Sequence, residues 1–161
     1  MLLKVSNLIN KIKQDVYLLI FVASSLAIIG AYVAEFVFHL QPCILCIYQR
    51  IPYFLLIVFS LITVLAPITR QYLRFVISLS IVAEIVLASY HVGVERYIFE
   101  DSHVCQVQNG LNSTIQDMLS AGKIASTCSE VSFRFMNFSI VEWNLLYAIC
   151  LFYWFSRTFR Q

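Results

Sequence analysis

Two cysteines, Cys43 and Cys46, are separated by two residues at the point where one long apolar run ends and the next begins. This C-x-x-C spacing brings both sulfur atoms together near the start of a helix, where one thiol commonly has a lowered pKa. Thiol–disulfide exchange proceeds through attack by such a thiolate. The pair therefore predicts redox chemistry.

Arg50 follows the pair at a helical spacing. If a helix begins near Cys43, the i, i+3 and i+7 positions place Cys43, Cys46 and Arg50 along one stripe. A guanidinium one turn beyond Cys46 would stabilise a thiolate near the helix N-terminus and offer donors to an electron-rich oxygen. An arginine whose side chain reaches from the membrane boundary to the lipid headgroups is the alternative interpretation.

The composition indicates a membrane protein. Of the 161 residues, 60% are hydrophobic and 12% are charged, and the mean hydropathy is +0.80. A soluble domain of this size does not bury so much apolar surface, whereas a helix that crosses a bilayer needs about 20 apolar residues. We expect an all-α bundle of four transmembrane helices, forming one integral membrane domain over residues 1–161. The four runs lie at about 16–38, 51–66, 75–90 and 140–155.

Basic residues orient this predicted bundle. They lie at both ends of the chain and in the turn between the second and third runs, as Lys4, Lys11, Lys13, Arg70, Arg74, Arg157 and Arg160. Basic residues in short loops mark the cytoplasmic side, so both termini are expected in the cytoplasm. The opposite side then receives a turn at about 39–50 and a long loop at about 92–139. The net charge of +2 is small, and nothing indicates nucleic-acid binding.

The predicted topology separates the five cysteines. Cys43, Cys46, Cys105 and Cys128 fall on the non-cytoplasmic side, where disulfides form and persist, and Cys150 falls inside the fourth run. Purely structural disulfides are one interpretation, and a four-thiolate zinc site is another. Such zinc sites usually pair two C-x-x-C knuckles, but the two loop cysteines are far apart in sequence. The redox interpretation is favoured, and no metal ligand is assigned.

Several segments resemble one bacterial family. They are PCILCIYQR at 42–50, YHVGVE at 90–95, a cysteine in the long loop, and TCSEVSFRF at 127–135 followed by EWN at 142–144. Together, and in this order, they are similar to the disulfide bond formation protein B, or DsbB, family over essentially the whole chain. The resemblance implies a multi-pass protein of the bacterial inner membrane that oxidises a DsbA-type periplasmic partner and delivers the electrons to a quinone, either ubiquinone or menaquinone.

The same resemblance implies roles for the cysteines. A disulfide between Cys105 and Cys128 would be attacked by the reduced partner, with Cys105 forming the mixed disulfide. Cys128 would then exchange with Cys43, and the Cys46 thiolate would pass electrons to the quinone. The active cysteines would all lie on the periplasmic side.

Two further residues match the quinone side of the family's site. Arg50 matches an arginine that assists the quinone, and His91 matches a histidine implicated at the same site in some members. Gln49 stands where several members have an acidic residue, which predicts an Arg50 without an adjacent carboxylate.

Other functions remain open. A vitamin-K-epoxide-reductase-like or other membrane thiol–disulfide oxidoreductase is the nearest alternative, although in the former family the loop cysteines precede the C-x-x-C. A membrane scaffold with purely structural disulfides is an alternative of another class. Glu84, inside the third run, is either functional or hydrogen-bonded in the bundle, and it is left out of the candidate site. Residues 111–121 are expected to form a short helix on the membrane surface.

Overall fold

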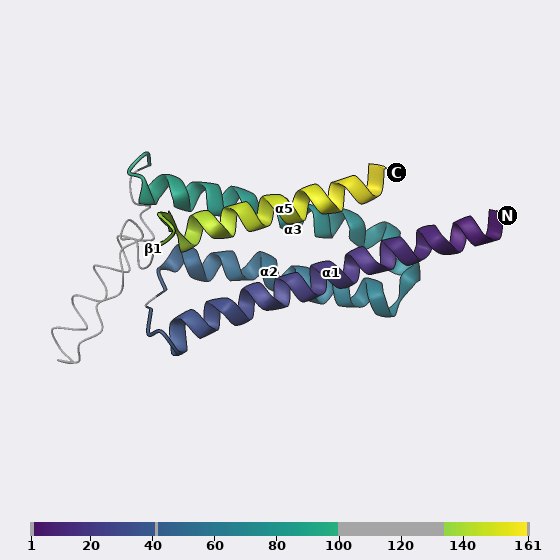
Figure 1. The fold of residues 1–161 in the computed structure, drawn as a ribbon, viewed down its shortest axis with the longest axis horizontal. Helices are drawn as coiled ribbons and strands as arrows, with labels where there is room; N and C mark the ends of the chain where they lie inside the picture. The colour runs from purple at the N-terminus through teal and green to yellow at the C-terminus, as the bar shows by residue number, and fades with distance from the viewer. Residues whose placement is uncertain (1, 41, 100–133, 161) are drawn as a thin grey trace.

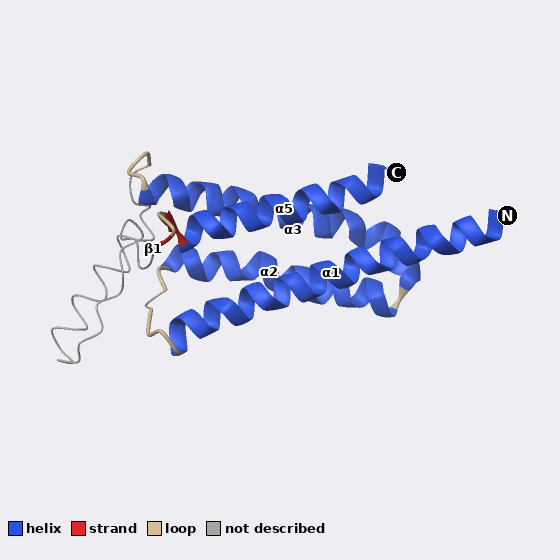
Figure 2. Cartoon of the chain, viewed as in Figure 1, coloured by secondary structure: helices blue, strands red, loops and turns tan. Residues whose placement is uncertain are grey.

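The computed structural model describes residues 2–40, 42–99 and 134–160. In these ranges four long helices run alongside one another as a bundle (Figure 1), and short connections join the first helix to the second and the second to the third (Figure 2). The elements are α1 (Leu2–Phe36), α2 (Ile44–Leu65), the 3₁₀ turn η1 (Pro67–Thr69), α3 (Arg70–Glu95), β1 (Arg134–Phe135), β2 (Phe138–Ser139) and α5 (Ile140–Arg160).

Three of the described helices are long and apolar enough to cross a membrane. These candidate spans are Gln14–Phe36, Ile44–Leu65 and Pro67–Glu95. Their length and composition confirm that the chain is a mostly helical membrane protein. The two short strands, which pair in antiparallel register with Arg134 opposite Ser139, were not predicted from the sequence. The predicted surface helix at 111–121 lies outside the described residues.

The second and third helices begin earlier than the apolar runs predicted for them. The second starts at Ile44 and the third at Arg70, so the turn predicted at 39–50 is too long. Cys43 is the N-cap of α2, and its sulfur accepts a hydrogen bond from the backbone N–H of Cys46 at 3.4 Å. The hydropathy pattern misses this first part of the helix because Gln49 and Arg50 are polar, although both side chains turn inward to line a cavity.

The bundle is apolar both inside and outside. Large apolar side chains are exposed on the outer faces, Leu26, Val86 and Trp154 among them, as a surface in contact with lipid requires. Small buried hydroxyls lie between the helices, and Ser80 donates to the carbonyl of Val76 in its own helix at 2.9 Å. The buried cluster at the centre contains Tyr17, Ile20, Tyr53, Leu56, Ile77, Ile81, Leu151 and Phe155.

A polar chain crosses the bundle and contains Glu84. The Tyr53 hydroxyl donates to the Asn144 side-chain oxygen at 2.7 Å, and the Asn144 amide donates to Glu84 Oε1 at 2.7 Å. Glu84 is 1% exposed. Its carboxyl group therefore links α3 to α5 and, through Asn144, to α2. This arrangement fits the interpretation of Glu84 as a group hydrogen-bonded within the bundle.

Substitutions at Glu84 should separate its hydrogen bond from its charge. Glu84→Leu removes the acceptor of Asn144, and we expect a loss of about 1 kcal/mol of stability, typical of an interhelical hydrogen bond. Glu84→Gln keeps a carbonyl oxygen at the same place and should leave stability nearly unchanged. Thermal unfolding in detergent, followed by circular dichroism, measures both. An equal loss in the two variants would show that the charge, and not the acceptor, holds the bundle.

Candidate functional site

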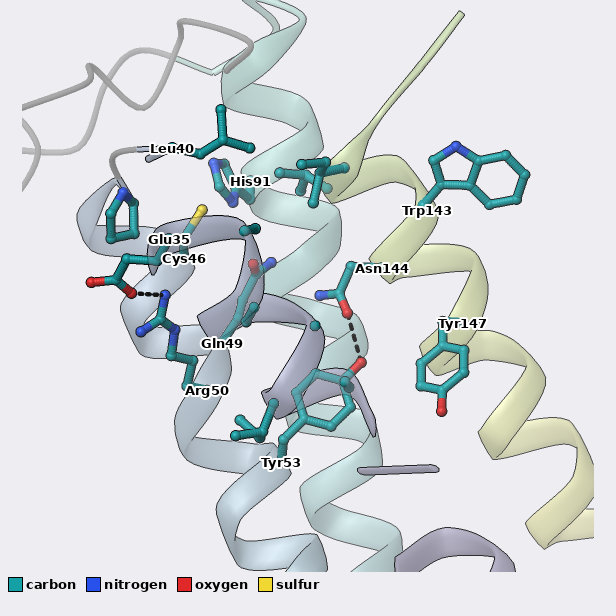
Figure 3. Close-up of a pocket in the computed structure, with 18 of the residues that line it drawn as sticks. Glu35, Leu40, Cys46, Gln49, Arg50, Tyr53, His91, Trp143, Asn144 and Tyr147 are labelled. Atoms are coloured by element: carbon teal, nitrogen blue, oxygen red, sulfur yellow. Dashed lines mark hydrogen bonds and ion pairs between the residues drawn. The ribbon is translucent and has the colours of Figure 1, made fainter. Parts of the chain in front are cut away.

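A cavity of about 600 Å³ lies at the end of the bundle that holds the C-x-x-C. The polar side chains around it come from all four helices (Figure 3). The wall from α1 carries small residues, Ala27, Gly30, Ala31 and Ala34. A Cβ atom added at Gly30 would meet nothing within 4 Å, so this wall leaves open space. The cavity can hold a small molecule with an apolar body and a polar end.

Cys43 and Cys46 lie together on this cavity as free thiols. Their sulfur atoms are 3.3 Å apart, and Cys43 is 5% exposed. The hydrogen bond between the two sulfur atoms lowers the pKa of Cys43, and the neighbouring His91 lowers it further, while burial opposes both. In the reduced pair, Cys43 is therefore the thiol that ionises first. The resemblance pointed instead to a thiolate at Cys46.

His91 approaches the pair from α3. Its Nε2 atom is 3.4 Å from the Cys43 sulfur, and its side chain is 1% exposed. Among the described residues, Nδ1 has no hydrogen-bond partner. The two sulfur atoms and a ring nitrogen of His91 all lie within 4.8 Å of one another. The predicted role of His91 at the quinone stays a prediction, but the structure brings this residue together with both cysteines.

Arg50 has a carboxylate partner, contrary to the expectation drawn from Gln49. One guanidinium nitrogen is 2.7 Å from Glu35 Oε2 (Figure 3), and the guanidinium carbon lies 4.8 Å from the centre of the Tyr32 ring. The Arg50 and Glu35 side chains are 13% and 27% exposed. The partner comes from α1 rather than from the adjacent position, so the motif alone did not reveal it. The sequence signal that could have revealed this partner is the charged residue Glu35 within the first apolar run, because such residues usually face the bundle interior.

Other polar residues of the cavity were also missed from the sequence. Gln49 is buried, and its side-chain nitrogen has no hydrogen-bond partner among the described residues. Tyr53 and Asn144 line the cavity below it and are hydrogen-bonded to each other (Figure 3). These groups make this part of the cavity polar, whereas the wall from α1 is apolar apart from Glu35.

The remaining cysteines are not part of the described cavity. Cys105 and Cys128 lie outside the described residues. Cys150 is exposed on α5 and does not line the cavity. Its exposure on a helix of the bundle fits a small residue facing outward.

The apolar helices and the reactive thiol pair at their end define a membrane protein of the thiol–disulfide class. The family described as disulfide bond formation protein DsbB matches residues 13–156. This chain belongs to the DsbB family. It is therefore a disulfide bond formation protein of the membrane, with the general role of a disulfide oxidoreductase.

Two of three individual relatives carry the name of this family. The chain is 36% identical to "Uncharacterized protein RP370" of Rickettsia prowazekii over 152 residues, which are 89% of this chain and 88% of that one. It is 24% identical to "Disulfide bond formation protein B" of Histophilus somni, covering 89% and 84% of the two chains. It is 29% identical to the protein of the same name from Cupriavidus metallidurans, covering 84% and 86%. No solved structure matches the chain.

Proposed function

We propose that this protein is a quinone-dependent thiol oxidase of the bacterial inner membrane that reoxidises a DsbA-type periplasmic partner. The observation that carries the proposal is the convergence of the C-x-x-C, Arg50 and His91 on one largely apolar cavity. In bacteria, the periplasm is kept oxidising by a chain of DsbA, DsbB and quinone. That chain is an established property of the family.

The proposed topology has four spans in one membrane domain of residues 1–161, with α5 as the fourth. The two ends of the described chain lie at one end of the bundle, together with η1, and the C-x-x-C lies at the other (Figure 1). The basic residues Arg70, Arg74 and Arg157 belong to elements at the first end, which is the arrangement of a cytoplasmic side. The thiol pair then faces the periplasm.

The proposed relay transfers two electrons through two cysteine pairs. A partner thiolate attacks Cys105 of the Cys105–Cys128 disulfide, and the partner's second thiolate breaks the mixed bond, leaving an oxidised partner and a reduced loop pair. The Cys128 thiolate attacks Cys43 of the Cys43–Cys46 disulfide, which expels Cys46 as a thiolate. Cys105 then attacks Cys128, so the loop disulfide re-forms and Cys43 is released. One turn of the relay therefore moves two electrons from the two partner thiols to the Cys43–Cys46 pair, which must pass both to the final acceptor.

This sequence of exchanges reconciles the two assignments of the thiolate. Cys43 ionises first when both thiols are free, since the hydrogen bond with Cys46 lowers its pKa. When Cys43 is bonded to Cys128, Cys46 is the leaving group and is the thiolate that remains beside the cavity. The His91 ring nitrogen 3.4 Å from the Cys43 sulfur can donate a hydrogen bond to the Cys43 thiolate when it is released.

The cavity fits a quinone ring. Its volume of about 600 Å³ lies within the range of about 300–1,000 Å³ for small-molecule sites. Arg50 offers charged donors to a carbonyl oxygen, and the small residues of α1 leave apolar space beside it. A bound quinone would accept two electrons and two protons as the Cys43–Cys46 disulfide re-forms. Glu35 keeps the Arg50 guanidinium at the edge of the cavity.

The test of the proposal is the requirement for quinone. The purified full-length protein in detergent is mixed with a reduced DsbA-type protein, and partner thiols are titrated with and without a soluble ubiquinone or menaquinone analogue. Partner oxidation beyond two equivalents per chain, one for each of its two disulfides, should occur only with quinone, with one quinone reduced per further partner disulfide formed. Sustained turnover without quinone under anaerobic conditions would contradict the proposal.

A further inference from the structure

The cluster of Cys43, Cys46 and His91 has the composition of a metal-ligand set. Thiolate and imidazole are the ligands that Zn²⁺ and related soft or borderline ions prefer. The three ligand atoms lie within 4.8 Å of one another, and two of the separations are 3.3 Å between the sulfurs and 3.4 Å between Nε2 and the Cys43 sulfur. Ligands of a tetrahedral zinc ion are separated by about 3.5–3.8 Å, from Zn–S and Zn–N bonds of about 2.3 and 2.0 Å.

We propose that the reduced C-x-x-C pair and His91 form a binding site for a borderline divalent cation of the Zn²⁺ type, and that the bound ion holds the pair in its reduced state. Ligand movements of about an ångström would bring the three atoms to tetrahedral spacing. The cavity beside them leaves room for a water molecule or a small anion as the fourth ligand. Metal sites of this kind, with three protein ligands and one open position, bind and exchange small ligands.

The surroundings of the cluster support coordination. The Cys43 sulfur accepts the backbone N–H of Cys46 at 3.4 Å, and a hydrogen bond of this kind compensates the charge of a metal-bound thiolate. The cluster is buried at the Cys43 and His91 positions, so bulk water competes poorly for the ion. Glu95 lines the same cavity and brings a carboxylate to its periplasmic end.

The environment of the other His91 ring nitrogen favours reversible rather than permanent binding of a metal ion. A ligating histidine usually donates its other ring nitrogen to a carboxylate or a carbonyl, which fixes the ring and increases affinity. Within the described part of the chain, His91 Nδ1 has no such partner. The site is therefore suited to an ion that binds and leaves, as an inhibitor does, rather than to a structural zinc.

Metal and disulfide exclude each other at this site. One divalent ion displaces the protons of two thiols and forms two metal–sulfur bonds, whereas the oxidised pair has an S–S bond and no thiolate to offer. The ion therefore binds the reduced form alone and stabilises it by mass action. Under the proposed function, it would stop the relay at the C-x-x-C, but the binding itself needs neither quinone nor partner.

Cobalt provides a direct test, because Co²⁺ bound to thiolate absorbs strongly by charge transfer. The full chain carrying Cys105→Ser, Cys128→Ser and Cys150→Ser is purified in detergent, reduced and titrated with Co²⁺, and the bound Co²⁺ is then displaced with Zn²⁺. We expect one ion per chain and a thiolate–cobalt band that is lost on oxidation of the remaining pair. Absence of the band from the reduced protein would overturn the proposal.

Two histidine variants in the same background distinguish a built site from simple chelation by two thiols. His91→Gln should weaken Co²⁺ binding at least about tenfold. Even the loss of a residue that only hydrogen-bonds a metal ligand commonly costs 10–100-fold in metal affinity. His39→Gln, at an exposed position of the same end of the bundle, should leave it unchanged. Equal affinity in the two variants would overturn the role of His91. Circular dichroism and gel filtration establish that each variant is folded.

Discussion

Replacing Cys43 and Cys46 together by serine is expected to abolish quinone-linked oxidation of the partner. A hydroxyl group neither forms a disulfide nor acts as the thiolate nucleophile that exchange requires, and removal of a catalytic nucleophile commonly lowers the rate by on the order of 10⁴-fold or more. The loop pair would still oxidise one equivalent of partner and then stop. Partner thiols are titrated against time with excess quinone, and quinone reduction is followed by its absorbance.

The two single variants should stop at different points. Cys46→Ser leaves Cys43 free to attack the loop disulfide, so a Cys43–Cys128 bond should accumulate and be found by mass spectrometry of non-reduced peptides. Cys43→Ser has no such acceptor for Cys128 and should accumulate none. Cys150→Ser removes an exposed thiol that does not line the cavity, and its turnover should equal that of the unmodified chain. Continued turnover in the double variant would contradict the relay.

The convergence of the motif residues follows from sequence and topology together. The C-x-x-C begins α2, and His91 lies in the last turns of α3. A short connection through η1 makes these two helices antiparallel neighbours, so the start of one meets the end of the other. Arg50 then falls within the same cavity because it lies two turns along α2 from Cys43. A pattern of apolar runs and helical spacing therefore predicts most of this side of the site.

The contacts to α1 and α5 could not be predicted in the same way. Glu35 meets Arg50, and Asn144 meets both Tyr53 and Glu84, only because each helix is rotated to present that side chain inward. Hydropathy reports how apolar a helix is but not its rotation about its own axis. A charged residue within an apolar run was the available signal, since such residues usually face the bundle interior. It applied to Glu35 as well as to Glu84.

Arg50→Met is expected to raise the apparent KM for quinone about ten- to hundredfold. A hydrogen bond to a charged donor contributes about 1.5–3 kcal/mol, and each 1.4 kcal/mol is a factor of ten in affinity. Exchange between the two cysteine pairs does not involve the guanidinium directly. The first equivalent of partner should therefore still be oxidised at the normal rate, while steady-state turnover at low quinone falls. An unchanged KM would favour the alternative that the Arg50 side chain only reaches from the membrane boundary to the lipid headgroups.

Glu35→Gln tests whether the ion pair positions this guanidinium. The carboxylate lies 2.7 Å from Arg50, and both side chains are partly shielded from solvent, so its loss should raise the KM for quinone in the same direction but only about two- to fivefold. In combination with Arg50→Met it should add nothing, because its effect acts through Arg50. Arg96→Met is the matched control, since Arg96 pairs with Glu142 and does not line the cavity; its KM should not change. Additive effects of Glu35→Gln and Arg50→Met on the KM would show instead that Glu35 acts on quinone binding independently of Arg50. The Glu35 carboxylate would then have to contact the quinone itself rather than position the arginine.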